Sequence, residues 1–163
     1  MTKINHGIIA AAASLLMVFV LCACSLNGGL TVGAYVDIVD NDVHEIVNIT
    51  RELKKQNENL DCRKKEDADK YISSLDRLSE LYSDLLKTEA PDHYNDLDDE
   101  IKPNAELAIS YISRLREMVS TASDTGDDSV YKQSGEAVLA SYEESYLKIV
   151  DLGSQVTTRF RND

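Results

Sequence analysis

The chain has 163 residues, with 17 Lys and Arg against 29 Asp and Glu, so its formal net charge is −12. A composition of 43% hydrophobic and 28% charged residues excludes collagen-like, low-complexity and multi-span membrane proteins. The acidic balance also argues against nucleic-acid binding, because phosphate backbones are bound by basic surfaces. The length corresponds to one domain.

The chain opens with an apolar run over residues 8–21, in which Ser14 is the one polar residue. Lys3 precedes the run, and the next charged residue after it is Asp37. A basic start, a short apolar run and small residues at its end are typical of a secretory signal. As a helix, residues 8–21 would rise about 21 Å, less than the roughly 30 Å hydrocarbon core of a bilayer. An uncleaved anchor, with the run extended to Leu26, stays open as the alternative.

This segment ends in Leu21-Cys22-Ala23-Cys24, which resembles the lipobox (Leu-x-small-Cys) of bacterial lipoproteins. The resemblance covers about the first 24 residues and implies a signal peptide over residues 1–23 that is recognised through Leu21 and Ala23. It implies that Cys24 is lipidated, becomes the mature N-terminus and anchors the protein at the extracytoplasmic face of a bacterial membrane. An ordinary signal peptide that ends near a chance cysteine is the competing interpretation.

Residues 24–34 are expected to form the lipidated cysteine and a flexible tether with three glycines. If Cys22 leaves with the signal and Cys24 carries lipid, Cys62 is the remaining thiol and no internal disulfide can form. We expect Cys62 to be free rather than paired between chains, because no activating histidine is near in sequence.

Residues 35–163 show helical periodicity along their length, with apolar side chains at steps of three and four. The first stripe runs from Val36 to Leu53, and its helix is predicted to end near Glu58-Asn59. A second helix carries apolar residues from Tyr71 to Leu86. Acidic residues near its start favour the positive end of the helix dipole; they are Glu66, Asp67 and Asp69.

A third helix is predicted to open at Ala90-Pro91-Asp92 and to continue to Val119. Pro103 interrupts its pattern and predicts a kink or a break. Residues 124–129 predict a turn, with Gly126 ending one helix and Asp or Ser capping the next. A fourth stripe then runs from Val130 to Val156.

Four amphipathic helices with short connections predict an all-α, up-down-up-down four-helix bundle over residues 35–163. In that arrangement the basic first turn and the acidic third turn meet at the tip farthest from the membrane. Several of the eight tyrosines are expected to pack in or beside the core with their hydroxyls in water, with a tyrosine-lined surface for a peptide or glycan as the alternative.

No catalytic, cofactor or metal constellation is recognised in the sequence. His44-Glu45-Ile46-Val47-Asn48 falls short of the zinc-protease pattern, because Asn48 replaces the second histidine. The acidic cluster from Asp96 to Glu100 is interpreted as a solvated helix start, with loose binding of divalent cations as the alternative. We therefore expect no enzyme and no cofactor.

The expected function is a membrane-anchored lipoprotein whose helical bundle binds a protein partner or has a structural role. One alternative is exclusion or immunity against a phage, a toxin or a cationic peptide, because the acidic domain would concentrate cations. Another is that the signal residues 15–23 are released as a hydrophobic pheromone.

Overall fold

The structure is a computed structural model that describes residues 30–163, and this part of the chain is helical with no β-strand. Four long helices pack against one another, and a short 3₁₀ turn precedes the third. They are α2 (Val32–Glu58), α3 (Lys65–Lys87), η1 (Asp92–Tyr94), α4 (Asn95–Thr125) and α5 (Ser129–Asn162). The predicted all-α class with four helices is confirmed.

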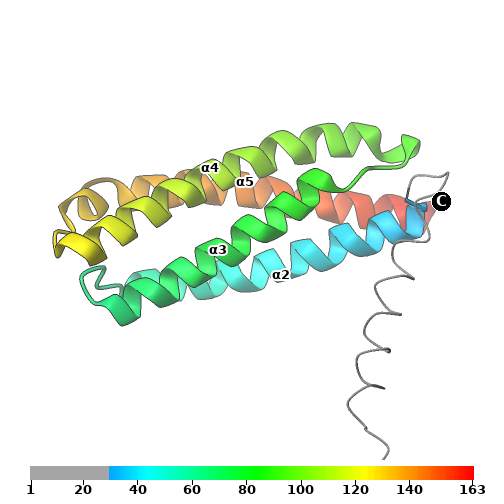
Figure 1. Ribbon diagram of the computed structural model, residues 1–163. Helices are drawn as coiled ribbons and strands as arrows, with labels where there is room; N and C mark the ends of the chain where they lie inside the picture. Colours follow the sequence, from blue (N-terminus) through cyan, green and yellow to red (C-terminus); the bar gives the residue numbers. More distant parts are fainter. Residues whose placement is uncertain (1–29) are drawn as a thin grey trace, which may run out of the picture.

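The helices form a ring in which each one packs on two neighbours: α2 on α3 and α5, and α4 on α3 and α5. Figure 1 shows that the α2–α3 and α4–α5 turns lie together at one end of the molecule. The α3–α4 connection, the start of α2 and the C-terminus lie at the opposite end. We call these the tip end and the tether end, because the undescribed residues 1–29 join the domain at the second.

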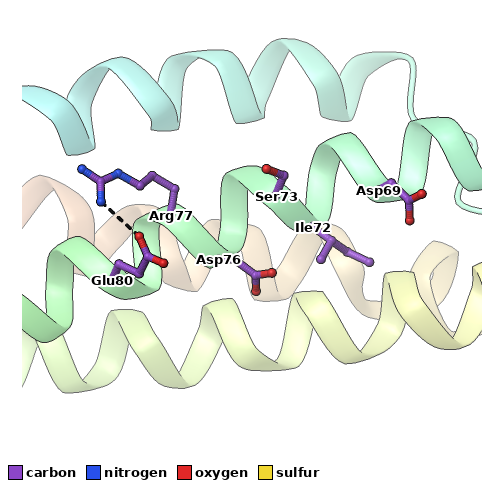
Figure 2. Close-up of a pocket in the computed structure, with 6 residues that line it drawn as sticks. All are labelled: Asp69, Ile72, Ser73, Asp76, Arg77 and Glu80. Carbon is purple, nitrogen blue, oxygen red and sulfur yellow. Dashed lines mark hydrogen bonds and ion pairs between the residues drawn. The ribbon is translucent and has the colours of Figure 1, made fainter. Parts of the chain in front are cut away.

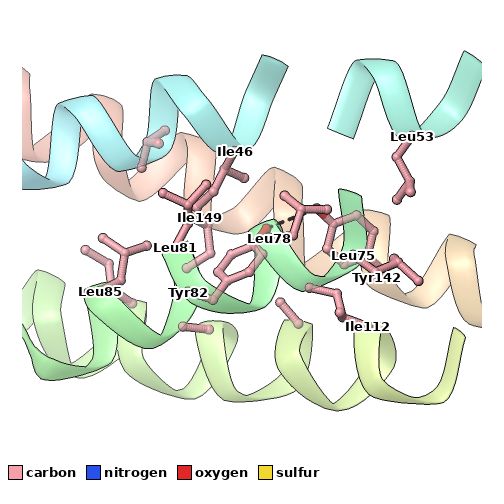
Figure 3. Close-up of a cluster of buried hydrophobic side chains, with 14 of the residues drawn as sticks. Ile46, Leu53, Leu75, Leu78, Leu81, Tyr82, Leu85, Ile112, Tyr142 and Ile149 are labelled. Atoms are coloured by element: carbon pink, nitrogen blue, oxygen red, sulfur yellow. Dashed lines mark hydrogen bonds between the residues drawn. The ribbon is translucent and has the colours of Figure 1, made fainter. Parts of the chain in front are cut away.

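Apolar stripes on all four helices meet in one continuous core. Leucines of α3 supply its centre, and Leu75, Leu78 and Leu81 are at most 2% exposed. Figure 3 shows these side chains pointing between the helices toward Ile46, Ile112 and Ile149. Burial of each such side chain contributes about 1.5–3 kcal/mol, so the core supplies the main driving force for folding.

The first helix begins earlier than its apolar stripe predicts. Thr31 is its N-cap, and the Thr31 side chain accepts a hydrogen bond from the Ala34 amide at 3.3 Å. Val32 packs partly buried against the core. Residues 32–34, which the sequence assigns to the tether, are therefore helical because a threonine cap and an apolar contact extend the first turn.

The helix around Pro103 is not broken, and α4 runs unbroken from Asn95 to Thr125. Proline removes one backbone hydrogen bond, but Pro103 lies on the exposed face of α4, where water can reach the carbonyl that loses its donor. The Asn104 side chain also donates to the Glu100 carbonyl at 2.8 Å, which adds a hydrogen bond beside the proline. The prediction of a break at Pro103 is wrong for these reasons.

The predicted turn between the last two helices is confirmed. Gly126 ends α4 in the left-handed region, with φ +72°. Asp127 then accepts a hydrogen bond from the Ser129 amide at 2.9 Å, which holds the turn just before Asp128, the N-cap residue of α5. At the other connection, the helix expected to open at residues 90–92 begins with η1, in which the Tyr94 amide donates to the Pro91 carbonyl.

Candidate functional site

The residues that carry the lipobox resemblance lie outside the described part of the chain. Leu21, Ala23 and Cys24 precede residue 30, so recognition of the signal and lipidation of Cys24 remain predictions. The described chain starts close behind them, since α2 begins at Val32. Within residues 30–163, no helix has the length and apolarity needed to cross a bilayer.

The histidines of the described chain stand apart from each other. The His44 ring is 74% exposed and interacts through Nδ1 with the Asp40 carbonyl one turn earlier, at 2.8 Å. His93 is exposed in the middle of η1, and its carbonyl accepts a hydrogen bond from Arg159. Across residues 30–163 no three His, Cys, Asp or Glu side chains come close enough to hold a metal ion.

Three carboxylates of the acidic run at the start of α4 pair with three separate basic residues. Asp96 pairs with Arg159 at 2.6 Å, Asp98 with Lys102 at 2.6 Å, and Glu100 with Lys148 at 3.0 Å. Asp98 is only 6% exposed, so part of this run is buried rather than solvated as the sequence indicates. The carboxylates therefore do not converge on one point.

Opposite charges do meet at the tip end. Arg63 of the first turn lies 3.4 Å from the Asp128 carboxylate of the last turn, measured from Nε to Oδ2. Lys132 also contacts Asp128, at 3.0 Å. The predicted attraction between the basic and the acidic turn is thus present, although an exposed pair of this kind contributes only about 0–1 kcal/mol.

A buried polar layer crosses the centre of the bundle and was not anticipated from the sequence. Thr50 of α2, Tyr82 of α3 and Tyr142 of α5 are each at most 1% exposed. The Thr50 and Tyr142 hydroxyl oxygens lie 2.6 Å apart, and the Tyr82 hydroxyl donates to Tyr142 at 3.4 Å. Burial raises the pKa of Tyr142 to about 12, so the layer stays neutral. Figure 3 shows Tyr82 and Tyr142 reaching toward each other.

A second hydroxyl layer lies nearer the tip end. The Tyr131 hydroxyl donates to the Asn57 side-chain oxygen and lies 3.3 Å from the Tyr71 hydroxyl. The two rings are arranged edge to face, with centroids 6.3 Å apart. Tyrosines were expected to keep their hydroxyls in water; in both layers the hydroxyls instead bond within the protein, because several tyrosines face inward at matching heights.

Cys62 borders a small cavity of about 170 Å³ beside this layer. The cavity is lined by Asn57, Leu60, Cys62, Asp128, Tyr131, Lys132 and Glu136. Cys62 is free and 2% exposed, and burial together with the nearby Asp128 raises its pKa to about 11. A buried, protonated thiol is a poor nucleophile.

Two larger surface hollows on the described part of the chain each have a wall from one segment only. One of about 380 Å³ is formed by six residues of α3 alone, which Figure 2 shows along a single face: Asp69, Ile72, Ser73, Asp76, Arg77 and Glu80. Another of about 400 Å³ is lined by residues of the last ten positions, from Ser154 to Asp163. Because ligand pockets enclose most of their ligand, neither hollow is a built site for a small molecule.

The tether end holds a cluster of aromatic and charged groups. The buried Tyr35 and Tyr94 rings are tilted against each other with centroids 5.5 Å apart. The Arg159 guanidinium lies 5.4 Å from the Tyr94 ring centroid and binds both Asp96 carboxylate oxygens, at 2.6 and 2.7 Å. These hydrogen bonds lower the pKa of Asp96 to about 2. Arg159 thus fastens the last turn of α5 to the start of α4.

Comparison with known proteins gives no relative: no family model, no curated protein and no solved structure matches the chain.

Proposed function

We propose that this chain is an exported bacterial lipoprotein that displays an up-down-up-down four-helix bundle at the extracytoplasmic face of the membrane. The bundle binds a protein partner or has a structural role there. The observation that carries this proposal is Leu21-Cys22-Ala23-Cys24 at the end of an apolar run. The helical domain begins soon after it, at Val32.

The short connection fixes where the domain would stand. Seven residues, 25–31, separate Cys24 from the first residue of α2. Seven extended residues span at most about 25 Å. A lipid on Cys24 would therefore keep the tether end beside the membrane and direct the tip end outward (Figure 1).

A binding role is proposed in preference to catalysis because of what the bundle buries. The hydroxyls of Thr50, Tyr82 and Tyr142 are hydrogen-bonded to one another and sealed from solvent. Such a layer stabilises and aligns helices, and it offers no group to a substrate. The outer faces of the helices are therefore the surface on which the proposed function would act.

The anchor is tested by replacing each cysteine in turn in the native host. Cys24→Ser should abolish incorporation of labelled fatty acid and leave the precursor unprocessed, because the thiol that accepts the lipid is gone. Cys22→Ser and Cys62→Ser are matched controls that should remain labelled and membrane-bound. Lipid labelling that persists in Cys24→Ser, or is lost in Cys22→Ser, would contradict the proposal.

A second candidate function, exclusion of cationic peptides, is favoured by the charge distribution. Residues 30–163 hold 16 Lys and Arg against 29 Asp and Glu, a net charge of −13. Residues 84–102 alone hold seven acidic residues against two basic ones, at the end that would face the membrane. Such a surface attracts cations at low ionic strength. A gene deletion that leaves sensitivity to cationic peptides unchanged would remove this candidate.

A further inference from the structure

Asp42 occupies an unusual position on α2, at the edge that faces α3. Its side chain is partly buried, and the Oδ2 atom is inaccessible to solvent. Among residues 30–163, no group donates a hydrogen bond to this oxygen. A buried carboxylate oxygen without a donor is costly when the group is ionised.

The cation that acts on Asp42, Arg77, is engaged elsewhere. The Arg77 guanidinium of α3 donates from Nε and Nη2 to the two Glu45 carboxylate oxygens, at 2.8 and 2.9 Å. Its remaining terminal nitrogen donates to Glu80 at 3.0 Å. Lys87, the next basic residue along α3, pairs with Asp84 at 3.2 Å. Asp42 is thus left beside the acidic Asp84 and Glu45 with only partial compensation from Arg77.

The opposite edge of α2 offers Asp42 no compensation. That edge faces α5, where the Thr157 hydroxyl donates to Asp40 at 3.2 Å and Lys54 pairs with Glu143 at 3.0 Å. Burial first, and then Asp84 and Glu45, raise the pKa of Asp42 to about 6, while Arg77 lowers it. Because the pKa in the folded state exceeds the ordinary value of 3.8, folding favours the protonated group.

We propose that Asp42 is a proton-dependent latch between α2 and α3. With its proton, the carboxyl is a neutral group that fits the seam between the helices. Without the proton, its unpaired charge weakens the seam, and the first half of α2 opens more often. The stabilising contribution is present at pH 4 and below, and it is lost as the pH rises through about 6.

Loss of the proton would affect α2, the helix that joins the domain to residues 1–29. Proton loss above pH 6 would release α2 before the other helices, since the latch lies on α2 and acts across its contact with α3. We expect opening of α2 to become about tenfold more frequent when Asp42 loses its proton. The effect is no larger because Asp42 is partly exposed, so solvent screens its charge. The inference concerns the bundle alone and does not depend on the lipid anchor.

The test compares Asp42→Asn with Asp37→Asn in the full chain, purified in mild detergent. Asp37 is exposed on the same helix, so its replacement removes the same charge from outside the seam. Amide hydrogen exchange is measured at pH 5 and pH 7.5, corrected for intrinsic rates, with α4 as the internal reference. In the unmodified protein and in Asp37→Asn, protection of α2 relative to α4 should fall about tenfold at the higher pH. In Asp42→Asn it should not change.

A carboxyl-carbon NMR titration of Asp42 gives a second, direct measurement. A midpoint near pH 6 agrees with the latch, and a midpoint near 4 overturns it. Equal pH dependence of α2 protection in the unmodified protein and Asp42→Asn also overturns it. A loss of the dependence in Asp37→Asn would assign the effect to net charge and contradict the proposed role of Asp42.

Discussion

The tether end and the two hydroxyl layers both bury tyrosines, but the tyrosine hydroxyls are hydrogen-bonded only in the layers. Tyr82 and Tyr142 are fully buried, and their hydroxyls are hydrogen-bonded. Tyr35 and Tyr94 are equally buried, but their hydroxyls have no hydrogen-bond partner among residues 30–163. A paired hydroxyl contributes about 1 kcal/mol, whereas an unpaired buried hydroxyl costs about 1–3 kcal/mol.

The difference indicates how each region is held together. The layers combine aromatic packing with hydrogen bonds that require a fixed height and rotation of α2, α3 and α5. The tether end relies on the Tyr35–Tyr94 ring contact and on the surface ion pair between Arg159 and Asp96. We therefore expect the layers to specify the helix register and the tether end to tolerate change.

The largest expected difference in the free energy of unfolding is between Tyr142→Phe and Tyr35→Phe. Tyr142→Phe should lower the free energy of unfolding by about 2 kcal/mol, because it leaves the Thr50 and Tyr82 hydroxyls buried without their partner. Tyr35→Phe removes an unpaired hydroxyl and should leave stability unchanged or raise it. Urea unfolding followed by circular dichroism measures both, and equal losses would contradict the comparison.

The next largest loss of stability is expected where α2 and α5 approach each other closely. A Cβ built on Gly153 would lie 2.9 Å from Cγ2 of Val43, a short and stiff side chain. Gly153→Ala should therefore destabilise the protein by about 1 kcal/mol, since overpacking outweighs the gain in helix propensity. Adding Val43→Ala should remove the clash, so thermal unfolding of the double variant should show less than the sum of the two single losses. Additive losses would argue against contact at this point.

At the tip end, Gly126→Ala tests the cost of the backbone conformation alone, without a change in packing. No atom lies within 4 Å of the Cβ that alanine would add, so space is available. The left-handed φ of +72° is unfavourable for alanine and should cost about 1 kcal/mol. Gly33→Ala is the matched control, because its Cβ also meets no atom and α2 is an ordinary helix there. Chemical denaturation should show a loss for the first variant only.

The smallest effect is expected for Arg159→Gln at the tether end. The variant loses the two hydrogen bonds to Asp96 and the contact with the Tyr94 ring. Because the pair is exposed, the loss should be small and should shrink further at high salt. In the unmodified protein the stabilisation by Asp96 is present above pH 4 and is lost as the pH falls toward 2. A salt-independent loss would show that Arg159 acts by packing instead.

Periodicity was enough to predict the four helices and most of their ends, because these depend on local chemistry. Gly126 is an example in which one residue type specifies one backbone conformation. Of the kink or break predicted at Pro103, the break is wrong, because α4 continues through the proline. Pro103 lies between the buried Ile101 and Ala105 on the exposed face of α4, where the carbonyl that loses its donor is accessible to water.

The interior polar groups lay beyond sequence reasoning for a related reason. Thr50 and Tyr142 are 92 positions apart, and their contact depends on the relative rotation and height of two helices. Asp37 and Asp42 both lie off the apolar stripe of α2, yet only Asp42 places an oxygen in the seam with α3. A helix stripe identifies the buried face, but it does not tell which of its edges a neighbour covers.

The most direct test of the account is the intact mass of the N-terminal peptide from the native, membrane-extracted protein. A lipidated peptide that begins at Cys24 is the predicted result, because the signal would be removed before that residue. A peptide that begins at Met1, or one that begins elsewhere and carries no lipid, would contradict the proposed anchor.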